Sequence, residues 1–391
     1  MNLAVTCEFR FFRTPDGQVW TESVFLYEFW LRYLEAFSQV TVIARIQDVA
    51  EAKSNWQLSS GQQVAFVALP YYVGFSGLVK NALAIRKIIR QQINLADAVI
   101  FRVPSQSITL AAFGKAITTP YGVEVVGDPY DVFSSGITGT WLDRALAVTS
   151  CLSLKRICRR AEAACYVTQG YLQQRYPAGT SALSVGCSDI ELPANQILPS
   201  PRSYSQPASK LVFVGSLEQL YKGPDTLIEA LQQLNQQGIQ LTVNMLGCGR
   251  YLAHVKQLAE QKGCADNVNL LGAIEHAQVS NYLDEADVFV MPSRTEGLPR
   301  ALIEAMARGL PCVASNVGGI PELLPADVLV EKNDPHALAD CLKRLCLSPE
   351  KLTQASAQNL EKSKEYELNK LAKRRTDFYC GYKDRLQSDA I

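Results

Sequence analysis

The chain has no long hydrophobic run and no net charge. None of its apolar runs reaches the roughly 18 residues that a membrane-spanning helix requires, so any membrane contact is expected to be peripheral. Its 38 Lys and Arg residues balance 38 Asp and Glu residues. This balance argues against a general nucleic-acid binder, because such proteins usually carry a basic excess. The start, MNLAVTCEFRFF, has no basic region ahead of its apolar residues and includes Glu8, so we do not expect a signal peptide.

Histidine is scarce, and the cysteines have no metal-binding spacing. The 11 cysteines include no C-x-x-C pair, which predicts reduced, buried thiols in a cytoplasmic protein. Cys151, Cys158 and Cys165 recur at a regular interval. One buried helix face explains that interval better than a metal site does, since three ligands so spaced would span about 20 Å of helix.

The length of 391 residues suits two cores better than one. Strand and helix patterns alternate along the chain, which predicts parallel α/β layers. Helices are expected over Ser23–Phe37 and Leu152–Ala163, and a strand over Cys165–Thr168. A stretch rich in Pro and Ser without periodicity predicts a linker. The predicted organisation is a first domain over residues 1–195, a linker over 196–209, a second domain over 210–350, and charged helices over 351–391.

The most informative block is Val288–Val317. An apolar strand, Val288–Met291, leads into a polar loop that holds Glu296. Pro299 then opens a helix that carries Glu304, because proline fits the first helical position, whose N–H has no partner. The two carboxylates are therefore expected at the carboxyl end of a strand and on the following helix, where parallel α/β sheets bind ligands. The alternative is one loop Glu and one solvated helix Glu.

The sequence around these residues resembles a known family. PSRTEGLPRALIEAMARGLPCVAS, followed by NVGGIPELL, is similar to the donor-site signature of the family 4 glycosyltransferases, which have the two-domain GT-B fold. LVFVGSLEQLYKGPDTLIEAL resembles the phosphate-binding start of their second domain, and the match covers about Lys210–Leu324. In the N-terminal half, EFRFFRTPDGQVW, FRVPS and VEVVGDPYD resemble bacterial capsule and exopolysaccharide members.

The resemblance implies a fold and an activity. The fold would be two Rossmann-like domains facing a cleft, with a C-terminal helix crossing back to the first domain. The enzyme would be a retaining hexosyl- or related glycosyltransferase. It would move a sugar from a nucleotide-diphosphate sugar to a glycan acceptor, such as a lipid-linked intermediate of exopolysaccharide, capsule or O-antigen synthesis. UDP is the expected nucleotide because it is the commonest in the family, and GDP is the alternative.

The departing diphosphate needs fixed donors, because negative charge builds on it as the sugar leaves. Lys222 is the main candidate, since it stands directly before Gly223 at a helix start, where phosphate is favoured. The alternative is a solvent-facing loop Lys. Gly215 lets the backbone approach a ligand. The family often has Arg after this glycine, but this chain has Ser216, so another cation is a candidate for that role: Arg294, Arg300 or Arg102.

By the resemblance, Glu304 would accept hydrogen bonds from the ribose hydroxyls. Glu296 would lie against the donor sugar, and the amides of Gly297 and Leu298 would add to sugar or phosphate binding. Base recognition would use backbone groups near three further residues, Gly247, Gly272 and Ile274. No Asp-x-Asp motif occurs in the sequence. That motif holds a divalent metal in the other large glycosyltransferase fold, so we expect neither a metal nor another cofactor.

The first domain offers fewer candidates. Some relatives have a His after the strand that corresponds to Tyr121–Val126, and here that region holds Asp128. This carboxylate is a candidate to orient the acceptor or the sugar, or else a turn residue that caps the next helix. Gly17 is a candidate for backbone approach to the diphosphate, although Asp-Gly is first of all a turn signal. No second acid is obvious in this domain. A covalent route needs a carboxylate on the far face of the sugar, and by analogy with the family that the chain resembles, front-face substitution is favoured instead.

Acceptor recognition is expected from the first domain, which has two basic helices. One carries Lys80, Arg86, Lys87 and Arg90, and the other carries Lys155, Arg156, Arg159 and Arg160. Two interpretations are open for these basic helix faces: they are exposed to solvent, or they rest on anionic lipid at the inner membrane surface. Other functions stay open: a GT-B enzyme acting on a soluble acceptor, such as a synthase, a nucleotide-sugar epimerase, or a catalytically dead binding subunit. Intact Glu296, Glu304 and Lys222 argue against the last two, and Ser216 keeps the dead subunit open.

Overall fold

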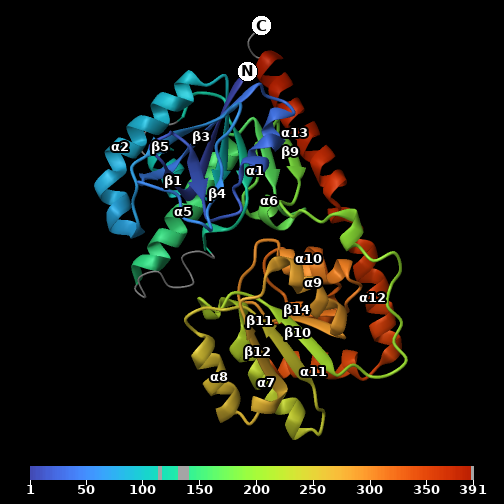
Figure 1. The fold of residues 1–391 in the computed structure, drawn as a ribbon. Coiled ribbons are helices and arrows are strands. Elements are labelled where there is room, and N and C mark those ends of the chain that lie inside the picture. Colours follow the sequence, from blue (N-terminus) through green and yellow to red (C-terminus); the bar gives the residue numbers. More distant parts are fainter. Residues whose placement is uncertain (113–116, 131–140, 389–391) are drawn as a thin grey trace. The chain divides into compact units, whose positions relative to one another are not determined.

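The computed structural model describes residues 1–112, 117–130 and 141–388 (Figure 1). The chain divides into two compact units. One comprises Met1–Cys187 with Ala372–Ile391, and the other comprises Ser188–Leu371. Each unit contains a sheet of mainly parallel strands with helices packed against it, which confirms the predicted pair of Rossmann-like domains. Among the described residues, no helix is both long and apolar enough to cross a bilayer.

The sheet of the first unit is parallel apart from a short antiparallel edge. Its parallel strands lie in the order β5, β3, β1, β6, β7, β8, β9. The last residues of β1 also pair antiparallel with β2, which in turn pairs antiparallel with β4. Every residue of β6 is buried, as expected for a central parallel strand covered on both faces. The strands are β1 (Asn2–Arg13), β2 (Val19–Thr21), β3 (Gln39–Asp48), β4 (Gln57–Leu58), β5 (Val64–Leu69), β6 (Ala98–Val103), β7 (Gly122–Val125), β8 (Ala163–Tyr166) and β9 (Leu183–Gly186).

The last helix of the chain completes the first unit. Tyr379 in this helix donates its hydroxyl to Glu124 Oε1 at 2.6 Å, and Tyr382 donates to the backbone oxygen of Val99 at 2.9 Å. The C-terminal helix therefore packs on the first unit, as the GT-B resemblance implies. The helices with residues in this unit are α1 (Tyr27–Leu34), α2 (Gly74–Leu95), α3 (Gln106–Ala112), α5 (Trp141–Arg159), α6 (Tyr171–Arg175) and α13 (Leu368–Ser388).

Some element boundaries predicted for the first unit were wrong. The helix expected over Leu152–Ala163 is α5, which ends at Arg159, and Ala163 already begins β8. All four residues of β8 are buried, and β8 pairs with both β7 and β9. These tertiary contacts override the helix propensity of alanine. Because Cys165 lies in β8, the three regularly spaced cysteines do not share one helix face.

The sheet of the second unit is parallel throughout, in the order β12, β11, β10, β13, β14, β15. Its strands are β10 (Lys210–Val214), β11 (Thr242–Leu246), β12 (Val268–Gly272), β13 (Val288–Met291), β14 (Cys312–Ser315) and β15 (Leu329–Val330). Its helices are α7 (Pro224–Gln236), α8 (Leu252–Gln261), α9 (His276–Glu285), α10 (Arg300–Ala307), α11 (Pro335–Cys346) and α12 (Pro349–Ser363).

The segment predicted as a linker, 196–209, belongs to the second unit. Its Leu198 N–H donates to Ala307 O at 2.9 Å. The Arg202 guanidinium donates to four backbone oxygens, those of Leu283, Asp284, Ala286 and Arg308, at 2.9, 3.3, 2.7 and 2.7 Å. The division between the units falls earlier, between Cys187 and Ser188.

Candidate functional site

In the second unit, the strand order reverses between β10 and β13. The chain places β11 and β12 on one side of β10 and then crosses back to place β13 on the other side. Open parallel sheets bind ligands at such a switch point, outside the carboxyl ends of the strands. Two loops leave the sheet there, 215–222 after β10 and 292–299 after β13. They carry most of the residues predicted for the donor site.

Lys222 and Glu296 meet between these two loops. The Lys222 ammonium lies 2.7 Å from Glu296 Oε1, and Ser293 donates its hydroxyl to the same oxygen at 2.6 Å. The side chains of Lys222 and Glu296 are 14% and 8% exposed. Lys222 is therefore not the solvent-facing loop residue of the alternative interpretation. A partly buried cation held by one carboxylate keeps donors for a second anionic partner.

Two glycines allow the loops to approach each other closely. Gly223 has φ +70°, and a Cβ there would collide with the carbonyl oxygen of Pro292. Gly318 has φ +57°, and a Cβ there would collide with the carbonyl oxygen of Glu296. The Gly319 N–H also donates to Gly297 O at 2.7 Å. Only glycine fits both this backbone conformation and this spacing. The glycines after β14 therefore fix the Glu296 loop from its other side.

Arg294, a candidate second cation, is engaged with protein groups. Its guanidinium donates to Asp225 Oδ2 and to Asn333 Oδ1, each at 2.6 Å, and to the backbone oxygen of Leu220. The backbone N–H of Arg294 donates to the backbone oxygen of Tyr221 at 2.6 Å. These bonds tie the turn before Lys222 to the start of α7. Arg294 therefore holds the Lys222 turn in place and is not positioned as a free phosphate ligand.

This arrangement predicts that Arg294→Lys impairs the enzyme although the charge is kept. A lysine ammonium cannot reach the separate acceptors that the planar guanidinium bridges. We expect catalytic efficiency toward the donor to fall roughly fivefold to tenfold, measured as kcat/KM. Arg344→Lys, at an exposed position of α11 in the same unit and away from the candidate site, is the matched control. Equal behaviour of the two variants would contradict the role given to Arg294.

Glu304 projects from the middle of α10 and is partly buried. Its backbone oxygen accepts the Arg308 N–H, but its carboxylate accepts no hydrogen bond from the described residues. Burial raises the pKa of this carboxyl, and the nearby His276 and Arg300 charges partly oppose the rise. A desolvated carboxylate without a partner is costly unless a ligand supplies donors. The two hydroxyls of a ribose are donors of that kind.

The remaining donor-site candidates lie at the same edge of the sheet. Gly247 follows β11 and Gly272 is the last residue of β12, and the Gly247 N–H donates to Gly272 O at 2.8 Å. Ile274 follows Gly272 and is partly buried. The Ser216 hydroxyl accepts the Glu218 N–H at 3.2 Å, which stabilises the loop after Gly215. A Cβ on Gly215 would lie 3.0 Å from Lys222 Cγ, so this glycine leaves room for the lysine stem. Among the described residues, the amides of Gly297 and Leu298 donate to no protein acceptor.

In the first unit, Asp128 is buried and fully engaged. Its carboxylate forms an ion pair with Arg175 and accepts the Tyr176 hydroxyl. It also accepts the Tyr130 N–H at 2.8 Å, which is the turn contact of the alternative interpretation. Burial, together with this carboxylate, holds the pKa of Tyr176 above its ordinary value. As placed here, Asp128 is not exposed to an acceptor.

The other two first-domain candidates have structural partners. Arg102 forms a buried ion pair with Glu124, and Tyr33 also donates to this carboxylate at 3.0 Å. Gly17 has φ +83° and lies in the turn that joins β1 to β2, where its N–H donates to Thr14 O at 2.9 Å. The turn accounts for this glycine without a ligand.

Sequence reasoning did not single out three residues of the donor region. Ser293 anchors Glu296, Asp225 anchors Arg294, and His276 lies close enough to influence the pKa of Glu304. Ser293 and Asp225 both fall inside the sequence blocks quoted for the resemblance. Their position inside those blocks was the available signal. Ser293 is three residues from its partner Glu296, whereas Asp225 is 69 positions from Arg294.

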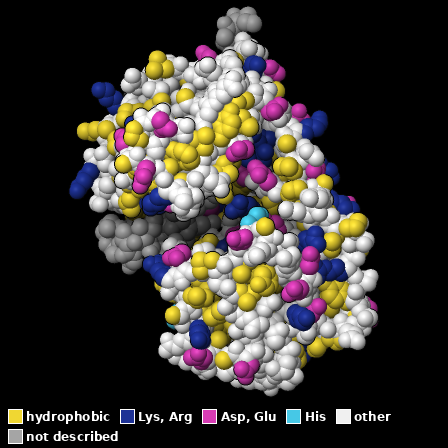
Figure 2. Space-filling model, viewed as in Figure 1, with side chains coloured by type: hydrophobic (Ala, Val, Ile, Leu, Met, Phe, Trp, Pro, Cys, Tyr) yellow, Lys and Arg dark blue, Asp and Glu magenta, His cyan; other side chains and the backbone are white. Residues whose placement is uncertain are grey.

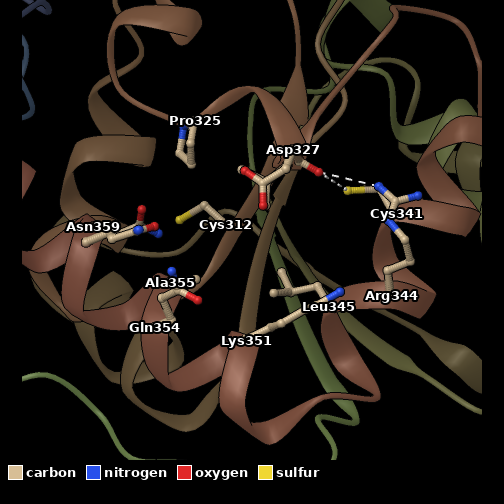
Figure 3. A pocket seen from close by; sticks show the side chains of 12 residues that line it. Cys312, Pro325, Asp327, Cys341, Arg344, Leu345, Lys351, Gln354, Ala355 and Asn359 are labelled. Carbon is tan, nitrogen blue, oxygen red and sulfur yellow. Dashed lines mark hydrogen bonds between the residues drawn. The ribbon is translucent and has the colours of Figure 1, made fainter.

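A separate pocket of about 320 Å³ lies in the second unit, with α11 and α12 on its walls (Figure 3). Cys312, at the amino end of β14, lines it. Cys341 Sγ and Arg344 Nη2 both contact the backbone oxygen of Asp327, at 3.7 and 3.4 Å. Because the predicted donor residues follow the carboxyl ends of the strands, this pocket at the opposite edge is distinct from the candidate site.

Comparisons with known proteins find matches to part of the chain and to nearly all of it. Residues 203–362 match the family described as "Glycosyl transferases group 1". "Protein CapJ" of Staphylococcus aureus is 26% identical over 366 residues, which are 92% of this chain and 90% of that protein. The "Putative colanic acid biosynthesis glycosyltransferase WcaL" of Escherichia coli (strain K12) is 41% identical over 154 residues, which are 37% of this chain and 38% of that protein.

Among solved structures, Anabaena Alr3699/HepE in complex with UDP-glucose is similar in fold. The TM-score is 0.63 at 15% sequence identity, covering 99% of this chain and 100% of that chain. At this identity the likeness concerns the fold alone, and it confirms the GT-B architecture that the sequence resemblance implied.

Proposed function

Since the chain carries a group 1 glycosyltransferase domain, we propose that it is a retaining glycosyltransferase that uses a UDP-sugar. Its acceptor is a hydroxyl of a glycan, in the form of a lipid-linked intermediate of exopolysaccharide, capsule or O-antigen synthesis. The name of the Escherichia coli relative, the putative colanic acid biosynthesis glycosyltransferase WcaL, supports this class of product. The observation that carries the proposal is the Lys222–Glu296 pair at the switch point, beside the unpartnered Glu304.

The chemistry follows from these groups. The bond between the anomeric carbon and the diphosphate oxygen breaks, and a bond from the acceptor oxygen to that carbon forms on the same face. The acceptor proton passes to the departing diphosphate oxygen. Lys222 and the amides of Gly297 and Leu298 stabilise the charge that develops on the diphosphate. Glu296 fixes Lys222 and lies toward the donor sugar, and Glu304 holds the ribose.

UDP is the nucleotide we propose. The similar Anabaena fold was solved with UDP-glucose, and the resemblance in sequence favours the same base. GDP stays the alternative, since base recognition would rest on backbone groups near Gly247 and Gly272.

Slow donor hydrolysis tests the proposal without knowledge of the acceptor. The purified protein is incubated separately with UDP-glucose, UDP-galactose, UDP-N-acetylglucosamine and GDP-mannose, and release of the free sugar is followed. Hydrolysis of one donor, lost in Lys222→Ala, supports an active transferase. Binding of nucleotide without hydrolysis of any donor would favour a dead binding subunit, an option that Ser216 keeps open.

Activity is expected to survive removal of divalent metal. The cation in the proposed diphosphate site is Lys222, and the sequence contains no Asp-x-Asp motif. Donor hydrolysis should therefore stay within about twofold of its initial rate in excess EDTA, a difference of roughly 0.4 kcal/mol in barrier. Loss of activity in EDTA, restored by manganese or magnesium, would contradict the metal-free mechanism.

We further propose that the first unit rests on the inner membrane surface. On α2, Leu83 is 85% exposed, and Val79, Lys80 and Lys87 are exposed on the same helix. Figure 2 shows Lys and Arg side chains beside hydrophobic ones along the edge where Figure 1 draws α2. Exposed apolar residues flanked by Lys are the composition of an interfacial helix. Arg90 differs from the other basic residues, because its guanidinium donates to Ala111 O.

Vesicle flotation tests this contact. The wild type should float with anionic vesicles at low salt and less at high salt, because exposed charges are screened. Lys80→Glu with Lys87→Glu should lower the partition coefficient at least about tenfold, since each basic residue at an anionic surface contributes roughly 1 kcal/mol. Lys256→Glu with Lys332→Glu, in the second unit, is the matched control. If the wild type does not float with anionic vesicles at low salt, a soluble acceptor becomes the better hypothesis.

A further inference from the structure

A β-bulge interrupts β1 at the carboxyl end of the first sheet. β1 pairs with β3 up to Cys7 opposite Ala44, and pairing resumes with Arg10 opposite Arg45. Glu8 and Phe9 are therefore the extra residues of the bulge. The pairing of β1 with β6 ends just before it, at Thr6 opposite Phe101. Bulges of this kind re-aim side chains and are frequent next to active sites.

The bulge turns Glu8 toward the segments that follow the neighbouring strands. Tyr72, shortly after β5, donates its hydroxyl to Glu8 Oε1 at 3.0 Å. Ser105, shortly after β6, donates to Glu8 Oε2 at 2.6 Å. Ser107 contributes its N–H and its hydroxyl at the longer distance of 3.4 Å. Arg45 donates to Tyr72 O at 3.2 Å and places its guanidinium over the Tyr72 ring. The ends of neighbouring strands thus converge on one carboxylate, at the edge where α/β sheets bind ligands.

Glu8 differs from the two other carboxylates near this edge. Glu124 and Asp128 are 5% and 3% exposed, and both are in ion pairs with arginines, Arg102 and Arg175. Glu8 is only partly buried and accepts hydrogen bonds from neutral hydroxyls. A carboxylate has about four acceptor sites, and two of the four contacts to the Glu8 carboxylate, those from Ser107, are long at 3.4 Å. Of the three carboxylates, Glu8 is the least buried, and the short hydrogen bonds to its carboxylate come from Tyr72 and Ser105, not from an arginine.

We infer that Glu8 binds hydroxyl groups of the sugar acceptor, an inference that rests on the proposed glycosyltransferase function. The ligand class is a neutral pyranoside, whose hydroxyls donate to the carboxylate. Phe9, the other residue of the bulge, is 49% exposed, and its ring packs against Phe25 at 4.5 Å between centroids. It offers a fixed apolar surface for the C–H groups of a sugar ring. Glu8 thus takes the acceptor-side role for which Asp128 is too deeply buried.

Saturation-transfer NMR with methyl glycosides tests this site. The probes are the α and β methyl pyranosides of glucose, galactose and mannose, each offered to the wild type, Glu8→Gln, Glu28→Gln and Glu304→Gln. Glu28 is an exposed carboxylate of the same unit, and Glu304 belongs to the donor site of the other unit. We expect at least one glycoside to give a signal with the wild type. That signal should persist in Glu28→Gln and Glu304→Gln and fall at least about fivefold in Glu8→Gln.

The outcomes separate this inference from the proposed function. No signal from any glycoside with the wild type, or an equal signal in Glu8→Gln, overturns the acceptor site. UDP affinity, measured on the same samples, tests the donor site independently and should be unchanged in Glu8→Gln. If Glu8→Gln does not fold, Glu8→Asp serves instead, because it keeps the charge but withdraws the carboxylate by one methylene. Its signal should then be weaker than that of the wild type, and an unchanged signal overturns the inference.

Discussion

Replacement of Lys222 by alanine is expected to lower turnover at saturating donor by at least tenfold. The change removes the cation beside the developing diphosphate charge, and loss of one such preorganised donor elsewhere costs roughly 100-fold to 1,000-fold in turnover. The measurement is the rate of sugar release from UDP-glucose. Lys262→Ala is the matched control, since Lys262 also faces a glutamate, at 3.6 Å, but on the helical surface of the same unit.

The same variant has a second expected effect, on stability. Without Lys222, the Glu296 carboxylate, which is 8% exposed, keeps the Ser293 hydroxyl but loses its counter-charge. An uncompensated buried charge destabilises the fold. The melting temperature of Lys222→Ala should therefore drop, and adding Glu296→Gln should restore part of it while activity stays low. Full activity of Lys222→Ala at saturating donor would show that the phosphate site is misplaced.

Glu304→Gln and Glu296→Gln are expected to fail in different ways. Glu304→Gln should weaken UDP affinity on the order of tenfold, because hydrogen bonds to a charged acceptor contribute roughly 1.5–3 kcal/mol. Glu296→Gln should keep UDP affinity within about twofold and lower turnover at least about tenfold, since it loosens Lys222 and removes charge near the sugar. Isothermal titration with UDP and donor hydrolysis give the two numbers. Equal losses of UDP affinity in both variants would contradict this division of roles.

The pH dependence of UDP binding should report on Glu304 as well. Burial raises the pKa of this carboxyl, so protonation begins at a higher pH than for an ordinary glutamate. The protonated form is a poorer acceptor for two hydroxyls, and UDP affinity should fall as the pH drops through the raised pKa. Protonation of the phosphates contributes in the same direction. In Glu304→Gln, only the part of the pH dependence of UDP affinity that comes from phosphate protonation should remain. A pH profile identical to that of the wild type would argue against a contact between Glu304 and the ribose.

The sequence predicted the second unit better than the first, for a physical reason. Strands such as Val288–Met291 are buried along their whole length, so an uninterrupted apolar run marks them clearly. Gly309, with φ +65°, follows the C-cap of α10, where a glycine in the left-handed conformation is common. In the first unit, Ala163–Tyr166 is also apolar but begins with two alanines, which favour helix, and pairing with two neighbouring strands makes it β8.

The candidate site was predictable as a set of residues but not as a set of contacts. Lys222 and Glu296 are 74 positions apart, and nothing in the local pattern indicates that their side chains form an ion pair. The ties of Arg294 to Asp225 and Asn333 are equally invisible in sequence, which is why Arg294 was considered a phosphate ligand. Glu8 was not identified as a site residue because nothing in the local sequence indicates that the strand bulges there. The bulge that re-aims Glu8 depends on pairing with β3.

The most direct test of the donor site is a crystal structure of the chain with UDP bound. The account predicts a diphosphate oxygen within hydrogen-bonding distance of Lys222 Nζ, roughly 2.7–3.2 Å, and the ribose hydroxyls on the carboxylate of Glu304. The uracil should lie near Gly247 and Gly272. UDP bound away from the carboxyl ends of β10 and β13, for example in the pocket of Figure 3, would contradict the account.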